Sequence, residues 1–227
     1  MYSARALELV GDPEIAARIV PLARLSEKRG RRPTGVAALD ALLGGGWPRG
    51  ALTELRGARS SGRTAIVRAA LAAVLAAGEA AALIDAGGTL DARAVPVGET
   101  SAAAPLWIRC AAEQALKAAD LVIAAGGFGL VALDLCDARL RAPDAAWVRL
   151  RHAARAQGTT VLVTTGRARL GSFAAAAVEL DGAAAFLGEG PPLFSGLEVR
   201  ARGRRVDEAP PDQPQPPCVS LAFTCRS

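Results

Sequence analysis

Residues 57–64 read Gly57-Ala58-Arg59-Ser60-Ser61-Gly62-Arg63-Thr64 and form a glycine-bounded loop. The apolar residues 51–55 before it predict a buried strand, and the alanine-rich residues 64–77 after it, which end at Gly78, predict a helix. A strand, a glycine-bounded loop and a helix in this order are typical of a phosphate-binding loop, where backbone N–H groups at the helix N-terminus surround a phosphate. This stretch therefore predicts an α/β fold with the loop at the end of a central strand.

The loop departs from the full phosphate-loop pattern at one position. The spacing is G-x-x-x-x-G-K-[ST], but Arg63 stands where the pattern has lysine. In a working loop the lysine reaches the β- and γ-phosphates, and the next hydroxyl, here that of Thr64, binds Mg²⁺. Arginine keeps the charge, but its planar fork is wider than an ammonium and prefers two-pronged pairing. We expect a vestigial nucleotide site without efficient hydrolysis, in which weak nucleotide or sulfate binding stays open. Its residues are Gly57, Ser60, Ser61, Gly62, Arg63, Thr64 and Asp134.

Asp134 enters this set because it ends the apolar run 131–134, where an aspartate that holds the water shell of Mg²⁺ is needed. A carboxylate that caps the end of a buried strand is the alternative.

Further strands and helices alternate along the chain as far as residue 165. Strands are predicted at 81–85, 106–110, 130–135 and 159–165, and helices at 113–119 and 145–156. This alternation predicts a mostly parallel central sheet flanked by helices on both faces. Residues 177–180, 197–202 and 219–224 are strand-like with no helix between them, so we expect antiparallel strands added at one edge.

The chain divides into an N-terminal part, residues 1–33, and a core domain, residues 34–227. A helix is predicted over residues 13–25 and a solvated basic linker over 28–32. Within the core we expect a helix over 34–43 capped by Thr34, a tight turn over 47–50 with Trp47 in the core, and a proline-rich surface loop over 210–217.

Composition narrows the function classes. Of the 227 residues, 51% are apolar and 22% charged, which is globular, and the net charge of +5 with a pI near 9.6 permits an acidic or nucleic-acid partner. The four cysteines contain no C-x-x-C pair, and the single histidine, His152, completes no familiar zinc site, so we expect free buried thiols and no metal. No apolar stretch has the length of a membrane span and charged residues interrupt the N-terminal apolar run, so we expect a cytoplasmic protein without membrane contact.

Several runs resemble the start of the ATPase core of RecA. They are residues 34–40, Pro48, Gly50, residues 53–57 and 60–64, and residues 82–86 followed by Leu90-Asp91. The run 44–55, Gly-Gly-Gly-Trp-Pro-Arg-Gly-Ala-Leu-Thr-Glu-Leu, resembles the ImuA family, the RecA-like accessory proteins of bacterial mutagenic lesion bypass. The resemblance implies a RecA-like core and a part in the SOS response and translesion synthesis. It implies RecA, an ImuB-type polymerase adaptor and an error-prone polymerase as partners.

Two positions that the resemblance makes catalytic are altered. The glutamate that orients the attacking water in RecA follows the Ile-Asp-Ala run, and here that position is Gly87. Glycine cannot polarise water, so with Arg63 the site has lost two groups. We therefore expect no catalytic residue, no enzyme activity and no required cofactor, with weak Mg²⁺–ATP binding left open.

Contacts with DNA are expected to be weak or indirect. The segments that correspond to RecA's two DNA-binding loops are short, about ten residues after Asp134 and the seven residues 166–172. Arg167 and Arg169 remain as candidate phosphate or partner contacts. Arg202 and Arg204 stand where RecA carries a Lys-x-Lys pair that reaches a neighbour's nucleotide, and an exposed basic hairpin turn is the alternative.

Three functions remain open from the sequence. The first is a non-catalytic accessory protein of DNA damage tolerance that binds other proteins and is free to self-associate. The second is a divergent DNA-dependent ATPase in which Asp85 or Asp91 replaces the missing base. The third is an interaction module that binds nucleotide without hydrolysing it.

Overall fold

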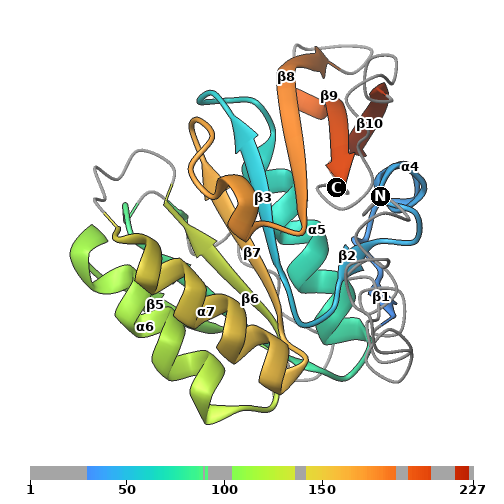
Figure 1. Cartoon of the computed structure of the whole chain (residues 1–227). Helices are drawn as coiled ribbons and strands as arrows, with labels where there is room; N and C mark the ends of the chain where they lie inside the picture. The colour runs from blue at the N-terminus through green and yellow to red at the C-terminus, as the bar shows by residue number, and fades with distance from the viewer. Residues whose placement is uncertain are drawn as a thin grey trace, which may run out of the picture.

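The central feature of the fold is an eight-stranded sheet in the order β10-β9-β8-β3-β7-β6-β4-β5 (Figure 1). The computed structural model describes residues 30–88, 90–91, 104–135, 142–187, 194–205 and 218–224. The helix predicted at 13–25 and the proline-rich loop at 210–217 lie outside these residues, so the division of the chain at residue 33 stays a prediction.

Five strands form the parallel part of the sheet, as the alternating pattern predicts. They are β3 (Leu52–Gly57), β4 (Ala80–Asp85), β5 (Leu106–Arg109), β6 (Phe128–Asp134) and β7 (Thr160–Thr165). The helices between them are α5 (Arg63–Ala76), α6 (Ala112–Ala125) and α7 (Asp144–Gln157). The mostly parallel α/β fold is therefore confirmed.

Three long strands extend the sheet beyond β3. They are β8 (Ala176–Leu187), β9 (Phe194–Arg205) and β10 (Cys218–Thr224). Strand β8 pairs parallel with β3, β9 pairs antiparallel with β8, and β10 pairs antiparallel with β9. This confirms the antiparallel edge. The prediction of a hairpin turn around Arg202 is wrong, because Arg202 and Gly203 lie inside β9, opposite Glu179 and Val178.

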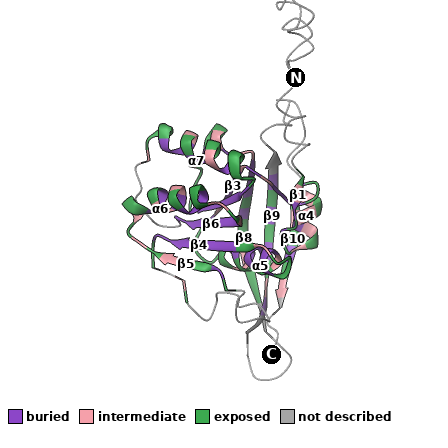
Figure 2. Cartoon of the chain, turned by 90° about the horizontal axis from the view of Figure 1, so that it is seen from below, coloured by how far each residue is buried: buried purple, intermediate pink, exposed green. Residues whose placement is uncertain are grey.

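Alternating residues of the central strands pack in two separate hydrophobic cores. Ala81 and Leu83 of β4 belong to the core beneath α4 and α5, whereas Ala82 and Ile84 belong to the core beneath α6 and α7. Figure 2 shows the buried strands enclosed between helices that are exposed on their outer sides. Both faces are thus apolar, which explains the continuous apolar runs of these strands.

The N-terminal edge of the core differs from the sequence prediction. Residues 31–32 form strand β1 (Arg31–Arg32), which pairs antiparallel with β2 (Trp47–Pro48), so the prediction of a solvated linker is wrong for these two residues. The turn predicted over 47–50 is confined to Arg49 and Gly50, which follow β2. Arg32 is only 2% exposed, and its Nη2 donates a hydrogen bond to Glu79 Oε2 at 2.8 Å. Trp47 lies in the core as predicted, with no exposed surface.

The first helix of the described chain is α4 (Ala37–Leu42). Its N-cap is Val36, without a side-chain cap, so the predicted cap at Thr34 is wrong. Thr34 Oγ1 instead accepts a hydrogen bond from Val36 N, and Thr34 N donates to Asp40 Oδ1 at 2.7 Å. The helix packs closely on β9, since a Cβ at Gly203 would lie 2.7 Å from Leu42 Cγ.

The expectation of buried thiols is wrong for the two cysteines that the structure describes. Cys110 is half-buried and Cys218 is exposed, and both are free. Among the described residues, none of the helices combines the length and the apolar character that a membrane crossing requires.

Glu79 links the N-terminal edge to the sheet through two arginines, and its charge makes that link dependent on pH. Arg32 Nη1 lies 2.7 Å and Arg49 Nη2 3.3 Å from Glu79 Oε1. The hydrogen bond from Arg32 lowers the pKa of Glu79 below its ordinary value of 4.5; burial opposes this shift, and the charges of Arg32 and Arg49 reinforce it. The stabilisation is therefore present above pH 4.5 and is lost as the pH falls through the lowered pKa.

We expect Glu79→Gln to lower the midpoint of urea unfolding at neutral pH, because Arg32 then faces a neutral amide. The difference from the wild type should shrink as the pH falls below 4.5 towards the lowered pKa of Glu79. Glu113→Gln, a change at an exposed glutamate of α6, is the matched control and should have little effect. A difference that does not vary with pH would contradict the role of this charge.

Candidate functional site

The phosphate-loop residues lie at the carboxyl end of β3, in the middle of the sheet (Figure 1). From β3 the chain passes through α5 to β4 on one side, whereas from β7 it crosses to β8 on the other side of β3. Such a reversal opens a crevice at the carboxyl ends of the strands, where open α/β sheets bind ligands. The loop therefore occupies the favoured ligand position of this topology.

The loop is folded tightly on itself and against β9. Ser60 and Gly62 have left-handed φ values of 59° and 91°. A Cβ at Gly57 would collide with Ser61 Oγ, and a Cβ at Gly62 would collide with the side chain of Val199. Gly57 is thus required by a close approach, and Gly62 by both its backbone conformation and its packing.

Arg63, which replaces the lysine, is buried at the first position of α5. It is 6% exposed, and its Nη1 has no hydrogen-bond partner among the residues that the structure describes. Ser61 Oγ is likewise buried without a partner in the described chain, whereas Thr64 is exposed. A buried guanidinium without a carboxylate is costly, and a phosphate is a group that it would pair with. The loop residues therefore fit an anion.

Two aspartates stand side by side at the same edge. Asp85 of β4 and Asp134 of β6 are in direct register, and Asp134 is in register with Thr164 of β7. Asp134 is 5% exposed and accepts a hydrogen bond from Thr164 Oγ1 at 2.6 Å. Asp85 is fully buried, and its Oδ2 lies 3.5 Å from Arg109 Nε. Each carboxylate is thus held by a neighbour.

Gly87 is exposed, close in sequence to these aspartates, at the position where the resemblance to RecA places the catalytic glutamate. Nearby, burial and then the negative charge of Asp85 raise the pKa of the Cys110 thiol. This thiol therefore stays protonated and is not a nucleophile at neutral pH.

Glu54 is a site residue that the sequence patterns did not predict. It is fully buried in β3, and its Oε1 accepts hydrogen bonds from Thr165 Oγ1 at 3.1 Å and from the backbone N–H of Arg169 at 2.7 Å. Its Oε2 is paired with Arg56 at 2.8 Å. The signal in the sequence was an acid among the apolar residues of a central strand. Glu54 fixes the segment after β7, where the predicted arginines lie.

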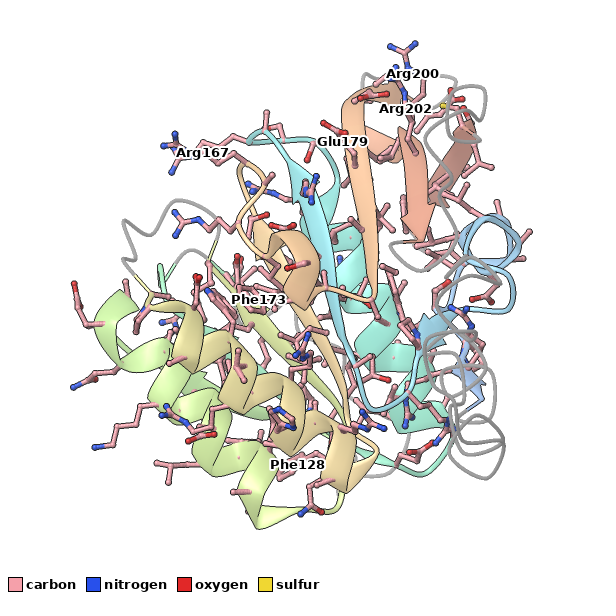
Figure 3. All side chains as sticks on the ribbon, in the orientation of Figure 1. Phe128, Arg167, Phe173, Glu179, Arg200 and Arg202 are labelled. Atoms are coloured by element: carbon pink, nitrogen blue, oxygen red, sulfur yellow. The ribbon has the colours of Figure 1, made fainter. Side chains whose placement is uncertain are left out.

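The four arginines predicted as contacts lie on two different elements. Arg167 is exposed on the segment after β7, and Arg169 is half-buried on the same segment. Arg202 lies on β9 and pairs with Asp181 Oδ2 at 2.6 Å, while the side chain of Arg204 lies outside the described part. Figure 3 shows Arg167 on one side and Arg200 and Arg202, two residues within β9, on the other, with Glu179 between them.

Comparisons with known proteins show a relationship to RecA. The family model of the RecA N-terminal domain matches residues 18–145. Protein RecA of Mycobacterium marinum is 41% identical over 104 residues, which cover 45% of this chain and 30% of the relative. Protein RecA of Nocardia farcinica is 40% identical over the same length and coverage, and Protein RecA of Clavibacter michiganensis subsp. michiganensis is 41% identical, with 29% of its length covered. The match thus spans less than a third of these relatives.

We expect Glu54→Gln to loosen the segment 166–170, because the amide loses the charge that holds Arg56 and the backbone N–H groups. Disturbing a buried, charged hydrogen-bond acceptor should lower the free energy of unfolding by about 2 kcal/mol. Trypsin should also cut faster after Arg167 and Arg169 in the folded protein. The control is Glu179→Gln, at an exposed position of β8. Unchanged tryptic cleavage in Glu54→Gln would contradict this role.

Proposed function

Because the chain belongs to the RecA N-terminal domain family, we propose that it is a non-catalytic RecA relative that binds other proteins of bacterial DNA damage tolerance. The run 44–55, which resembles the ImuA family, supports an accessory role in translesion synthesis. The partners that follow from this resemblance are RecA itself, an ImuB-type adaptor and an error-prone polymerase.

The observation that carries the proposal is the state of the charged groups around the phosphate loop. The water-orienting glutamate is replaced by the exposed Gly87, and the lysine by the buried Arg63. A general base has to accept a proton from water, and a carboxylate that is already held by a cation is a poor base. Glu54 is paired with Arg56 and Asp85 with Arg109, so neither buried acid can readily replace the missing glutamate.

A divergent ATPase is disfavoured by the same contacts. It needs Asp85 or Asp91 to activate water, and Asp85 is fully buried beside Arg109. Asp91 is exposed, so it is the carboxylate that would have to activate water.

Nucleotide binding without hydrolysis is the second candidate, and a different observation favours it. Arg63 Nη1 and Ser61 Oγ are buried without partners in the described chain, at the N-terminus of a helix. A phosphate would supply the missing acceptor and negative charge. Under this alternative, bound nucleotide sets the shape of the partner surface.

We expect the purified chain to show no ATP turnover above background, with or without single-stranded DNA. The double variant Arg63→Lys with Gly87→Glu should gain turnover by roughly tenfold or more, since a positioned general base contributes about 10²–10⁴-fold. Gly87 is exposed and does not have a positive φ, so it tolerates a side chain. The matched control is Arg63→Lys with Gly87→Gln, which adds the same bulk without the base.

Wild-type turnover that disappears in Asp134→Ala would overturn the non-catalytic proposal. Thermal unfolding of the same samples with Mg²⁺–ATP separates the two remaining candidates, because a ligand at a hundred times its Kd stabilises by about 2.7 kcal/mol. A shift that is lost in Arg63→Ala supports the nucleotide-binding module, and the absence of any shift at millimolar ATP removes it.

The accessory role predicts a direct effect on partner proteins. We expect the chain to change the ATPase and strand-exchange activity of RecA, or to bind a polymerase adaptor, in proportion to its concentration. Arg167→Glu is the informative variant, because Arg167 is exposed and its charge is not needed for the fold, and Arg151→Glu on α7 is its control. If RecA activity is unchanged and neither the adaptor nor the polymerase is bound, the proposal fails.

A further inference from the structure

A polar cavity lies at the opposite end of the sheet from the phosphate loop. Its volume is about 400 Å³, and it is lined by Arg32, Arg49, Glu79 and Arg155 together with Phe128, Gln157 and three glycines. Phe128 begins β6, Glu79 precedes β4, and Arg155 lies in the last turn of α7. The cavity is therefore built at the amino ends of the parallel strands. Figure 3 shows Phe128 far from Arg167 and Arg200.

The cavity carries an excess of positive charge. Three arginines face a single carboxylate, so the lining has a net charge of +2 when all four groups are ionised. Arg32 and Arg49 share Glu79, which lies within 2.7 Å and 3.3 Å of them. Arg155 is exposed and forms no ion pair with the described residues. One carboxylate thus balances only one of three cations.

Glycines give the cavity its shape. A Cβ at Gly129 would lie 2.6 Å from Glu79 Oε2 and 2.7 Å from Arg32 Nη1, so glycine is needed there for the ion pair to approach β6. Gly127 and Gly158 have nothing within 4 Å of the place where a Cβ would be, so they border open space. The ion pair between Arg32 and Glu79 forms the base of the cavity, and Gly127 and Gly158 leave space beside it for a ligand.

We propose that this cavity binds a small molecule that bears a phosphate group. A phosphate monoester carries a charge of about −1.5 to −2 at neutral pH, which matches the excess of the lining. The guanidinium fork pairs with phosphate through two parallel hydrogen bonds. Arg49 and Arg155 are accessible enough to make these contacts, while Arg32, only 2% exposed, holds Glu79 in place.

The size and form of the cavity favour a small molecule over a nucleic acid. Its volume is within the range of about 300–1,000 Å³ that is typical of small-molecule sites. Phe128, which is half-buried, gives an apolar wall for the organic part of the ligand. A nucleic-acid backbone would need a line of cations along an extended face, whereas here they converge on one concave site. The cavity is independent of the proposed accessory function, because it is formed by other residues, at the amino ends of the parallel strands rather than at their carboxyl ends.

Calorimetric titration of the full chain with inorganic phosphate, and separately with adenosine 5′-monophosphate, at constant ionic strength tests the proposal. Binding should be roughly tenfold weaker, or weaker still, in Arg49→Ala and in Arg155→Ala, because each loses a charged hydrogen-bond donor. It should be unchanged in Arg151→Ala, an exposed arginine one turn earlier on α7. Arg63→Ala serves to identify any additional binding at the phosphate loop, which would not depend on Arg155.

Each other outcome overturns the proposal. Binding of neither probe, or equal binding by the wild type and Arg155→Ala, removes the site. Binding that depends on Arg63 alone belongs to the phosphate loop. Arg155-dependent binding of single-stranded DNA without binding of either small probe makes the cavity a nucleic-acid contact. If Arg49→Ala does not fold, Arg155→Ala decides alone, because Arg155 has no ion pair with the described residues to lose.

Discussion

The arrangement of the strands around β3 depends on one buried carboxylate, that of Glu54. A charge with no exposed surface in a central strand is costly unless donors surround it. Here Arg56, Thr165 and the backbone N–H groups after β7 provide them. These contacts fix the point at which the chain leaves β7 and crosses β3 to become β8. Strands β8, β9 and β10 follow from that crossing, since β9 and β10 pair only outward from β8.

The amino ends of the strands are fixed in a similar way by a second buried charge. Arg32 is nearly inaccessible, and Glu79 connects it and Arg49 to the segment between α5 and β4. The β1–β2 ribbon is thereby tied to the sheet although only two residues of each strand pair. Both ends of the sheet thus contain a buried ion pair. At the carboxyl end the charge orders a loop, and at the amino end it leaves a positive cavity.

Local sequence patterns were sufficient for the parallel part of the fold and insufficient where distant contacts decide the structure. Apolar runs predicted β3, β4, β5, β6 and β7, most of which are buried on both faces, whereas the parallel pairing of β8 with β3 was not predicted. Helix α6 continues to Ala125 rather than ending near residue 119, because Val122 and Ile123 pack in the core beneath α6 and α7. Asp181-Gly182 has the composition of a turn, but a register shift at Gly182, with φ 144°, keeps β8 continuous.

The candidate site shows the same division. The glycine spacing was sufficient to locate the phosphate loop, because that spacing is a local backbone requirement. Glu54 and the β1–β2 pairing were missed, because Thr165 and Arg169, which contact Glu54, lie more than a hundred residues away in the sequence, and β1 pairs with a separate segment of the chain. Sequence analysis predicted that the side chain of Arg202 is exposed. Its ion pair with Asp181 could not be predicted, because it depends on the pairing of β8 with β9.

The phosphate loop packs on β9 and so connects the parallel strands to the antiparallel strands at the carboxyl end of β3. Gly62 lies so close to Val199 that a single added carbon would collide, and Leu197 lies near the same point. The neighbouring residues Glu198 and Arg200 point to the opposite, exposed face of β9, because side chains alternate along a strand. A group that displaced the loop would therefore press directly on the strand that presents Arg200 and Arg202 to solvent. Gly62 and Val199 are therefore a direct contact between the phosphate loop and the strand that carries Arg200 and Arg202.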